Sequence, residues 1–207
     1  MLERFKQKIW LQIFVIYTRY LLGSAFVFAS IIKIKGGRFT AQSGALNPID
    51  SSWHLFETLY QSGLYWKFLG IAQLISGFLL MTQRFAKLGA VINLPIVANV
   101  FVITISYYFA FTPVITGLIM LANIMLIVWD WNTLKVLINF QPSYNKYSKL
   151  ENDPIWQILG LLLFSFIVVS NLIASTKMLI PILVILLLTA LVGLVVGLRK
   201  QKADQNL

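Results

Sequence analysis

Six long apolar runs, separated by short polar stretches, fill most of this chain of 207 residues. A bilayer core about 30 Å thick is crossed by roughly 20 residues of apolar helix, and the runs approach that length. Inside lipid the backbone must satisfy its own hydrogen bonds, which restricts spanning segments to helices and closed barrels. Barrel strands alternate apolar and polar residues, whereas these runs are continuous. The sequence therefore predicts an all-α polytopic membrane protein.

The helix boundaries follow from the ends of the apolar runs. Pro113 and Pro154 each suit a first helical turn, where the missing N–H costs nothing. The six predicted spans are Leu11–Ile32, Tyr65–Met81, Lys87–Tyr108, Pro113–Trp131, Ile155–Ala174 and Met178–Leu198. We expect the first four to form a four-helix transmembrane core within residues 1–139. Residues 140–207 then supply a linker and a C-terminal transmembrane hairpin.

The longest connection, residues 34–64, contains an amphipathic segment. Apolar side chains recur at helical spacing from Trp53 to Tyr60, and Ser51 or Ser52 precedes them as a candidate helix cap. We predict a short helix here that lies against the outer end of the bundle. Two side chains of this segment are candidates for a site on the outer face: His54 and Glu57.

Basic residues favour one orientation of the chain. The formal net charge is +10, and most charges lie between the apolar runs, which indicates contact with membrane lipids and not with nucleic acid. With the N-terminus inside, the inner segments hold Arg4, Lys6, Lys8, Arg84, Lys87, Lys135, Lys146, Lys149, Arg199, Lys200 and Lys202. The outer segments hold Lys33, Lys35, Arg38 and Lys177. This bias favours a cytoplasmic location for both termini, although the first outer segment is itself basic.

The composition excludes several kinds of site. The chain has no Cys, one His and seven acidic residues. A thiol redox centre and a Cys-ligated metal or cluster are therefore excluded, and we do not expect a metal site built from the remaining ligands. Without haem-ligand His pairs or a nucleotide motif, we do not expect an autonomous enzyme either.

Ionisable residues inside a span are costly, and each marks a candidate functional site. Arg19 lies in the first apolar run, and Asp130 ends the fourth run at the same predicted depth. Thr116, Asn123 and Asp130 are each seven residues apart, which places them on one helix face. We therefore predict an ion pair between Arg19 and Asp130, with a structural and a functional role both open. In the alternative, Arg19 extends to the inner headgroups.

Further polar and small residues occur in the other spans. Asn93 and Asn99 flank Pro95, which favours a kink, so these amides either line a cavity or hold helices together. The polar cluster predicted inside the membrane comprises Arg19, Lys33, Gln73, Asn93, Asn99, Asn123 and Asp130. Close helix packing is predicted at Gly70, Gly77, Gly193 and Gly197.

Two stretches resemble the DoxX family of small bacterial membrane proteins. They are RYLLGSAFVFASIIKIKGGRF, from Arg19 to Phe39, and WKFLGIAQLISGFLLMTQRFAKLGA, from Trp66 to Ala90. The residues that match the family's pattern are Arg19, Lys33, Gln73, Gly77, Arg84, Leu88 and Gly89. The resemblance covers roughly residues 15–135. It implies a four-helix bundle in the bacterial inner membrane, with a quinone-linked redox association. The chain departs from it in two added C-terminal helices and in Gln73, where the family often has a carboxylate.

Three functions are compatible with these features. The leading expectation is a DoxX-like subunit or accessory of a larger membrane assembly, which contacts another subunit or a second copy through the glycine face of the last helix. The alternative is a quinone-linked oxidoreductase subunit with a cavity between the first four helices. Arg19 and Asp130 would lie at one end of that cavity, and Lys33, His54 and Glu57 at the other. The second alternative is a transporter of a small molecule or lipid.

Overall fold

The structure of the protein is a computed structural model that describes residues 5–142, 150–173 and 179–205. Every regular element in these ranges is a helix. Among the described residues, five helices are long and apolar enough to cross a membrane, as expected of a multi-pass membrane protein. They are α2 (Ile9–Ile34), α4 (Leu64–Met81), α5 (Ala86–Ser106), α6 (Thr112–Trp129) and α8 (Pro154–Ile173). The last apolar run forms α9 (Leu179–Gln205).

The predicted spans coincide with these helices, and most of their ends differ by only a few residues. The largest difference is at α9, which continues to Gln205 instead of ending at Leu198. Pro113 and Pro154 lie in the first turns of α6 and α8, as their fixed backbone favours. The predicted end of the fifth span, Ala174, and the predicted start of the sixth, Met178, lie outside the described residues.

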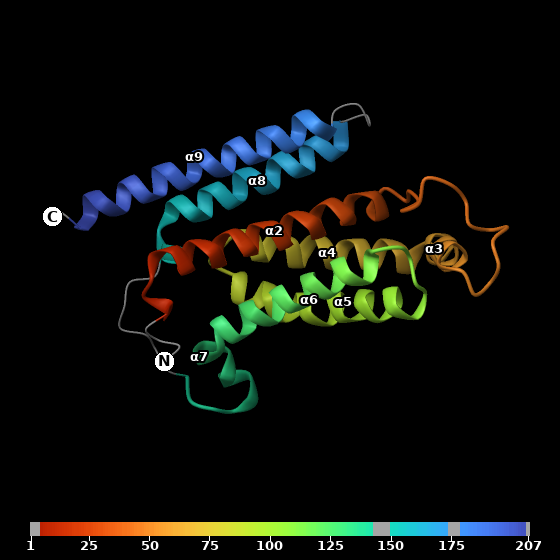
Figure 1. The fold of residues 1–207 in the computed structure, drawn as a ribbon, viewed down its shortest axis with the longest axis horizontal. Helices are drawn as coiled ribbons and strands as arrows, with labels where there is room; N and C mark the ends of the chain where they lie inside the picture. The colour runs from red at the N-terminus through yellow and green to blue at the C-terminus, as the bar shows by residue number, and fades with distance from the viewer. Residues whose placement is uncertain (1–4, 143–149, 174–178, 206–207) are drawn as a thin grey trace.

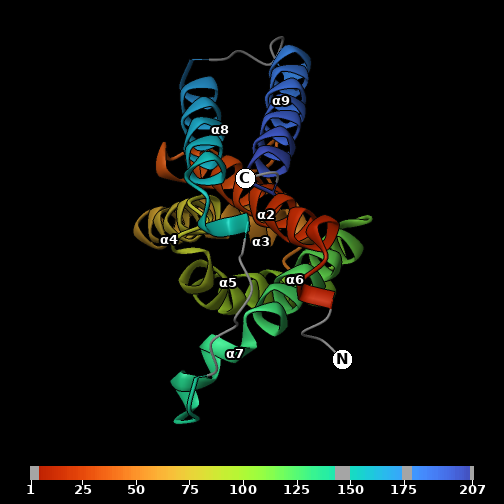
Figure 2. The same ribbon diagram turned by 90° about the vertical axis from the view of Figure 1, so that its left-hand side faces the viewer.

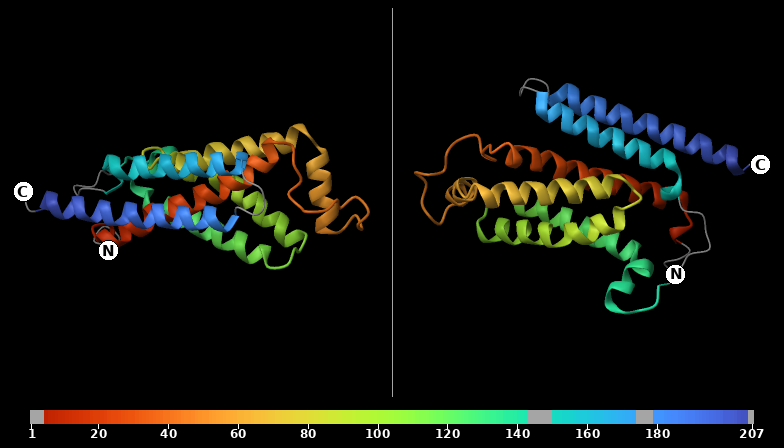
Figure 3. Two further views of the ribbon diagram at one scale, coloured as in Figure 1. Left: turned by 90° about the horizontal axis from the view of Figure 1, so that it is seen from above. Right: turned by 180° about the vertical axis from the view of Figure 1, so that it is seen from behind.

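The long helices stack in pairs, as Figures 1 and 2 show. α2 packs along α4 in the middle of the molecule, α5 packs along α6 on one side, and α8 packs along α9 on the other. α2 also contacts α6 and α8, so it lies at the centre. The first turn of α2 and the last turn of α9 lie at one end, which we call the terminal end (Figure 3). The opposite end carries a short helix, α3 (Ser52–Gln61), and is called the α3 end.

α2 and α4 approach each other closely because small residues meet at their contact. A Cβ atom on Gly77 would lie 2.8 Å from the Gly23 carbonyl oxygen, and one on Gly23 would lie 2.8 Å from that of Gly77. A Cβ on Gly70 would lie 3.0 Å from the carbonyl oxygen of the buried Ser30. Small residues let helix backbones pack at such distances. Gly70 and Gly77 therefore both lie at a helix–helix contact.

The glycine face of α9 packs against α8 of the same chain. A Cβ on Gly193 would overlap Leu159 Cδ2, and one on Gly197 would lie 2.5 Å from Trp156 Cζ2. The carbonyl of the buried Trp156 also accepts a hydrogen bond from the Tyr20 hydroxyl of α2. α8 of the same chain therefore packs on the glycine face through which we expected a second copy or another subunit to dock, and docking through α9 stays a prediction. A partner of α9 would have to contact the opposite, exposed face.

α3 closes one end of the molecule. The Ser51 hydroxyl caps this helix by accepting a hydrogen bond from the His54 backbone N–H at 3.2 Å. The rings of Trp53 and Phe109 pack edge to face with centroids 5.2 Å apart, which holds α3 against the turn between α5 and α6. The helix predicted over Trp53–Tyr60 is thus confirmed, and Trp53 and Phe56 both pack on Phe109, as amphipathic spacing favours.

The connection after α6 is partly helical, which the sequence did not indicate. α6 ends at Trp129 rather than at Trp131, and the chain continues through α7 (Trp131–Leu134) and the 3-10 helix η1 (Lys135–Ile138). A second 3-10 helix, η2 (Leu150–Asn152), precedes α8. Four residues of the charge analysis lie outside the described residues: Arg4, Lys146, Lys149 and Lys177.

Candidate functional site

The polar residues predicted to form one intramembrane cluster are distributed over three groups. From the terminal end to the α3 end, these groups contain Arg19 with Asp130, Asn93 with Asn123, and Lys33 with Gln73. Asn99 belongs to none of them, because its side chain is exposed at the edge of a cavity. Side-chain contacts therefore join these residues in smaller groups, and Ser76, whose hydroxyl bonds to both the Gln73 carbonyl oxygen and Asn93 Oδ1, links two of them.

At the terminal end, Arg19 holds two carboxylates. Its Nη2 lies 2.6 Å from Asp130 Oδ2, and its Nη1 lies 2.6 Å from Glu151 Oε2. Nη1 also donates a hydrogen bond to Gln83 Oε1 at 3.0 Å. The side chains of Arg19 and Asp130 are 1% exposed, and that of Glu151 is 11% exposed. The expected ion pair is therefore present, and the guanidinium does not extend to the headgroups.

The partners of Arg19 come from distant parts of the chain. Asp130 follows the last turn of α6, Gln83 lies in the turn between α4 and α5, and Glu151 lies in η2. Gln83 has a φ of 56°, which is uncommon for a residue with a side chain. The planar guanidinium offers five donors and suits two carboxylates at once. This group therefore fastens the ends of several elements to α2.

Sequence reasoning did not find Glu151 or Gln83. Both lie in connections, where helical periodicity assigns no face. The available signal was composition, because Glu151 is one of only seven acidic residues and lies just ahead of the fifth span. A buried arginine selects its partners from such a small set.

The middle group holds α4, α5 and α6 together. Ser76 Oγ donates to Asn93 Oδ1 at 3.1 Å, and Asn93 Nδ2 donates to Asn123 Oδ1 at 3.1 Å. Asn123 Nδ2 donates in turn to the Ala90 carbonyl oxygen at 3.0 Å. All three polar side chains are fully buried. Of the two roles left open for Asn93, these contacts show the one that joins helices.

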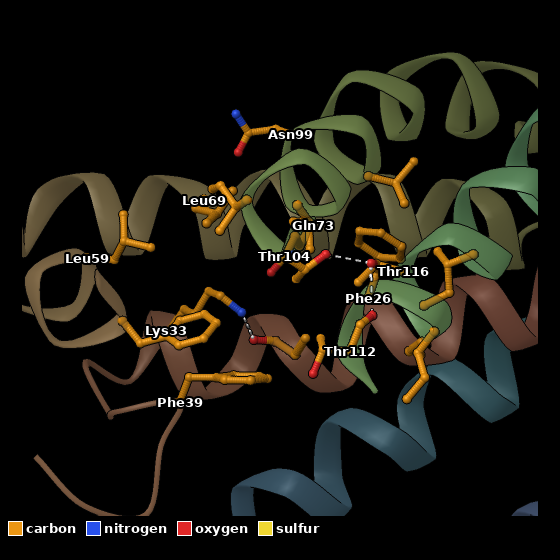
Figure 4. Close-up of a pocket in the computed structure, with 18 of the residues that line it drawn as sticks. Phe26, Lys33, Phe39, Leu59, Leu69, Gln73, Asn99, Thr104, Thr112 and Thr116 are labelled. Atoms are coloured by element: carbon orange, nitrogen blue, oxygen red, sulfur yellow. Dashed lines mark hydrogen bonds between the residues drawn. The ribbon is translucent and has the colours of Figure 1, made fainter. Parts of the chain in front are cut away.

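Near the α3 end, a cavity of about 360 Å³ lies among α2, α4, α5 and α6, with side chains of α3 along its edge (Figure 4). Small-molecule sites usually measure about 300–1,000 Å³ and have mostly apolar walls with a few polar groups. The aromatic residues of this wall are Phe26, Phe39, Phe56, Tyr65 and Trp66. Arg19, Asp130, His54 and Glu57, which we expected at the two ends of such a cavity, do not line it.

Lys33 turns its ammonium group back into the molecule, although it lies near the end of α2. Its Nζ donates a hydrogen bond to the Ala29 carbonyl, one turn earlier, at 2.8 Å. The ring centroids of Phe39 and Trp66 lie 5.1 and 5.0 Å from Nζ, within cation–π range. A lysine at this position usually extends to the interface. Lys33 is instead only 5% exposed and faces the cavity.

The Gln73 amide lines the same cavity and is 5% exposed. Its Oε1 is buried and has no hydrogen-bond partner among the described residues. Thr104 and Thr116, which also line the cavity, bond to each other through their hydroxyl oxygens at 2.8 Å. Buried polar groups are normally paired, so an unpaired one requires an explanation. Lys33 and Gln73 are therefore the polar groups most able to bind a ligand here.

No family model, curated protein or solved structure matches the chain. The structure does place the residues that carry the DoxX resemblance. Arg19 holds the ion pair at the terminal end, whereas Lys33 and Gln73 meet at the cavity. Arg84 is exposed in the turn before α5. Two motif residues that lie 40 positions apart in the sequence thus share one candidate site.

The two outer-face candidates, His54 and Glu57, fasten the connection that precedes α3. His54 Nδ1 lies 3.0 Å from the Asn47 carbonyl oxygen. Arg38 donates to both carboxylate oxygens of Glu57, at 2.9 and 3.0 Å. These hydrogen bonds with Arg38 lower the pKa of Glu57 from 4.5 to about 2. The two side chains therefore hold a loop in place instead of forming a shared site.

Proposed function

We propose that this protein is a DoxX-like multi-pass membrane protein that binds a lipid-soluble small molecule in the cavity near the α3 end. In this proposal it works as a subunit or accessory of a larger membrane assembly. The observation that carries the proposal is an aromatic cavity lined by a buried ammonium group and an unpaired amide, from Lys33 and Gln73. The five long apolar helices and α9 make six crossings, with both termini in the cytoplasm.

A quinone is the ligand that the resemblance implies, and the chemistry of the cavity supports it. Aromatic rings such as those of Phe39 and Trp66 can stack on a flat ring. Lys33 can donate a hydrogen bond to a quinone oxygen, and Gln73 Oε1 can accept one from a quinol hydroxyl. When bound, a quinone would supply the capacity to accept electrons. The chain's own part is to orient the ring and keep water away from it.

The composition supports the role as a subunit. With no Cys and one His, the chain has no Cys ligands for an iron–sulfur cluster and no pair of His ligands for a haem. An electron donor for a quinone would therefore be a partner protein. Purification from native membranes in mild detergent, followed by mass determination, tests this part of the proposal. A particle that contains a single chain and nothing else would contradict it.

A matched pair of variants on α5 tests the cavity. Val100 lines it, whereas Val102 is exposed and does not. Val100→Phe fills part of the cavity, and overpacking of about 1–3 kcal/mol corresponds to a loss of affinity of roughly five- to a hundredfold. We expect this loss for a short-chain quinone, measured by titration of the purified full chain, and no loss in Val102→Phe. Equal affinity of Val100→Phe and the unchanged protein would contradict the proposal.

A further inference from the structure

The cavity contains a positive charge that the described residues do not neutralise. Within ranges 5–142, 150–173 and 179–205, the ion pairs are formed by Arg19 and Arg38, and none is formed by Lys33. Glu57, the acidic residue of α3, is already held by two nitrogens of Arg38. A buried charge without an opposite charge is costly. The Ala29 carbonyl and two ring faces offset only part of that cost.

The surroundings of the cavity are also basic. The charged side chains at or next to the α3 end, from residue 33 to residue 67, are Lys33, Lys35, Arg38, Asp50, Glu57 and Lys67. Four of these are basic and two are acidic, and one of the acidic side chains belongs to the Arg38–Glu57 pair. A surface of one sign raises the local concentration of molecules with the opposite sign. This segment is basic although we predict it on the outer side, where basic residues are usually fewer. Attraction of an anion is a physical reason for its charge.

The Gln73 amide complements this charge. Its Oε1 is buried and has no hydrogen-bond partner within the described part of the chain. An amide offers one acceptor and two donors. A ligand headgroup with more than one oxygen can therefore contact Lys33 and Gln73 together, as the two residues approach one cavity from α2 and α4 (Figure 4). A neutral ring with a single oxygen would leave one of them unpaired.

From these observations we infer that the cavity binds the anionic headgroup of a single-chain amphiphile, a carboxylate or a phosphate monoester. One oxygen of the headgroup accepts a hydrogen bond from the Lys33 ammonium, and another accepts one from Gln73 Nε2. The aromatic wall of the cavity covers the part of the ligand's alkyl chain that is next to the headgroup. A volume of about 360 Å³ is near the lower limit for ligand sites, which favours one chain over a two-chain phospholipid. This inference rests on the proposed cavity function and narrows its ligand to an anion.

Binding of matched probes to the purified full chain in detergent tests this inference. The probes are a fatty acid, an alkyl phosphate and a fatty alcohol of one chain length, together with a short-chain quinone. We expect one of the anions to bind about tenfold or more tightly than the alcohol, as the loss of a charged hydrogen bond implies. Tighter binding of the alkyl phosphate assigns the site to phosphate headgroups, and tighter binding of the fatty acid assigns it to carboxylates.

Variants of Lys33 show whether its charge is responsible. Lys33→Met should remove the preference for the anion, and Lys33→Arg should retain most of it. Lys67→Met is the matched control, because Lys67 is an exposed lysine at the same end and does not line the cavity. Should Lys33→Met fail to fold, Gln73→Leu gives a second test. It should weaken the binding of the anions more than that of the alcohol, whose single oxygen cannot contact both residues, and an equal loss for anion and alcohol would overturn the inference.

The outcomes separate this inference from the proposed function. If the quinone and the alcohol bind while neither anion binds more tightly, the inference is wrong and the cavity function stands. If Lys33→Met weakens the anion and the alcohol equally, the inference is also wrong. If none of the four probes binds, both the inference and the proposed function are wrong.

Discussion

Arg19 of α2 and Asp130 after α6 form a buried ion pair of 2.6 Å, and Glu151 of η2 holds the same guanidinium at 2.6 Å. Removing one partner of a buried pair costs more than removing both, because it leaves an uncompensated charge. Because Glu151 also binds Arg19, the two single substitutions should differ in their cost to stability. Loss of Asp130 leaves Arg19 with a carboxylate, whereas loss of Arg19 leaves two carboxylates beside each other.

We therefore predict that Arg19→Met lowers the free energy of unfolding by about 3–5 kcal/mol, and that Asp130→Asn lowers it by less. The double variant should be more stable than the sum of the two single effects implies. Denaturant unfolding of the purified protein in detergent measures all three. Additive effects, within about 0.5 kcal/mol, would show that the two positions are not coupled.

The loop before α3 should lose stability in acid. Arg38 lowers the pKa of Glu57 from 4.5 to about 2, so the carboxylate is favoured by the folded state. A group with a lowered pKa contributes its full stability above its unfolded pKa and loses it as the pH falls toward the folded pKa. The contribution should therefore be complete above pH 4.5 and decline from there to about 2.

Glu57→Gln provides the comparison for this pH dependence, because it cannot ionise. We expect the difference in melting temperature between this variant and the unchanged protein to be clear at about pH 6 and to shrink by about pH 3. The exposed acidic residue Asp50 gives the control variant Asp50→Asn, which should show a smaller change over the same interval. A difference for Glu57→Gln that stays constant with pH would mean that the Arg38–Glu57 pair does not contribute.

Helix faces could be predicted from the sequence, including that of α3, whereas the turn after α4 and the connection after α6 could not. Thr116, Asn123 and Asp130 lie seven residues apart, and each one contacts another helix, through Thr104, Asn93 and Arg19. A period of 3.6 residues fixes such a stripe regardless of what packs against it. No helical periodicity applies to the turn at Gln83 or the short 3-10 helix at Glu151. These two partners of Arg19 could therefore not be predicted.

The candidate site could be predicted only in part, because helical periodicity describes one helix at a time. Lys33 and Gln73 were both recognised as polar residues of spans, but spacing within one helix does not show which residues of two helices share a cavity. The direction of the Lys33 side chain could not be predicted either, because the same position permits an ammonium at the interface. Its 2.8 Å bond to the Ala29 carbonyl and its two ring contacts show that it turns inward.

The contact between α2 and α4 should not tolerate a side chain at its closest point. Gly77→Val places a side chain where even a Cβ would lie 2.8 Å from the Gly23 carbonyl oxygen. We expect a loss of about 1–3 kcal/mol or more, measured by unfolding in detergent. Gly117→Ala is the control, since its Cβ would meet only the ring of Phe101, at 3.0 Å. Similar losses in the two variants would show that backbone proximity is not the cause.

Single-cysteine variants test the proposed orientation directly, because the natural chain contains no Cys. Ser43 is exposed in the loop before α3, and Lys135 begins η1 after α6. With both termini in the cytoplasm, Ser43→Cys should react with a membrane-impermeant thiol reagent in intact cells. Lys135→Cys should react only after the membrane is opened. The reverse pattern would overturn the orientation.

The glycine face of α9 leads to the last prediction. Gly193 meets Leu159 and Gly197 meets Trp156, so a large side chain there must push α9 away from α8. A helix face of small residues indicates that another helix packs closely on it, because contact with lipid does not require small residues. The sequence does not show which helix that is. The structure identifies that element as α8 of the same chain.

We predict that Gly193→Leu loosens the pairing of α8 with α9 while α2, α4, α5 and α6 remain folded. Val192→Leu on the exposed face is the control and should leave the pairing intact. The readout is crosslinking between cysteines introduced on α8 and α9, together with the mass of the purified particle. If Gly193→Leu keeps the crosslink but reduces the particle mass, the face contacts a partner after all. Loss of the crosslink at an unchanged particle mass is the expected result, because the packing that it breaks lies within one chain.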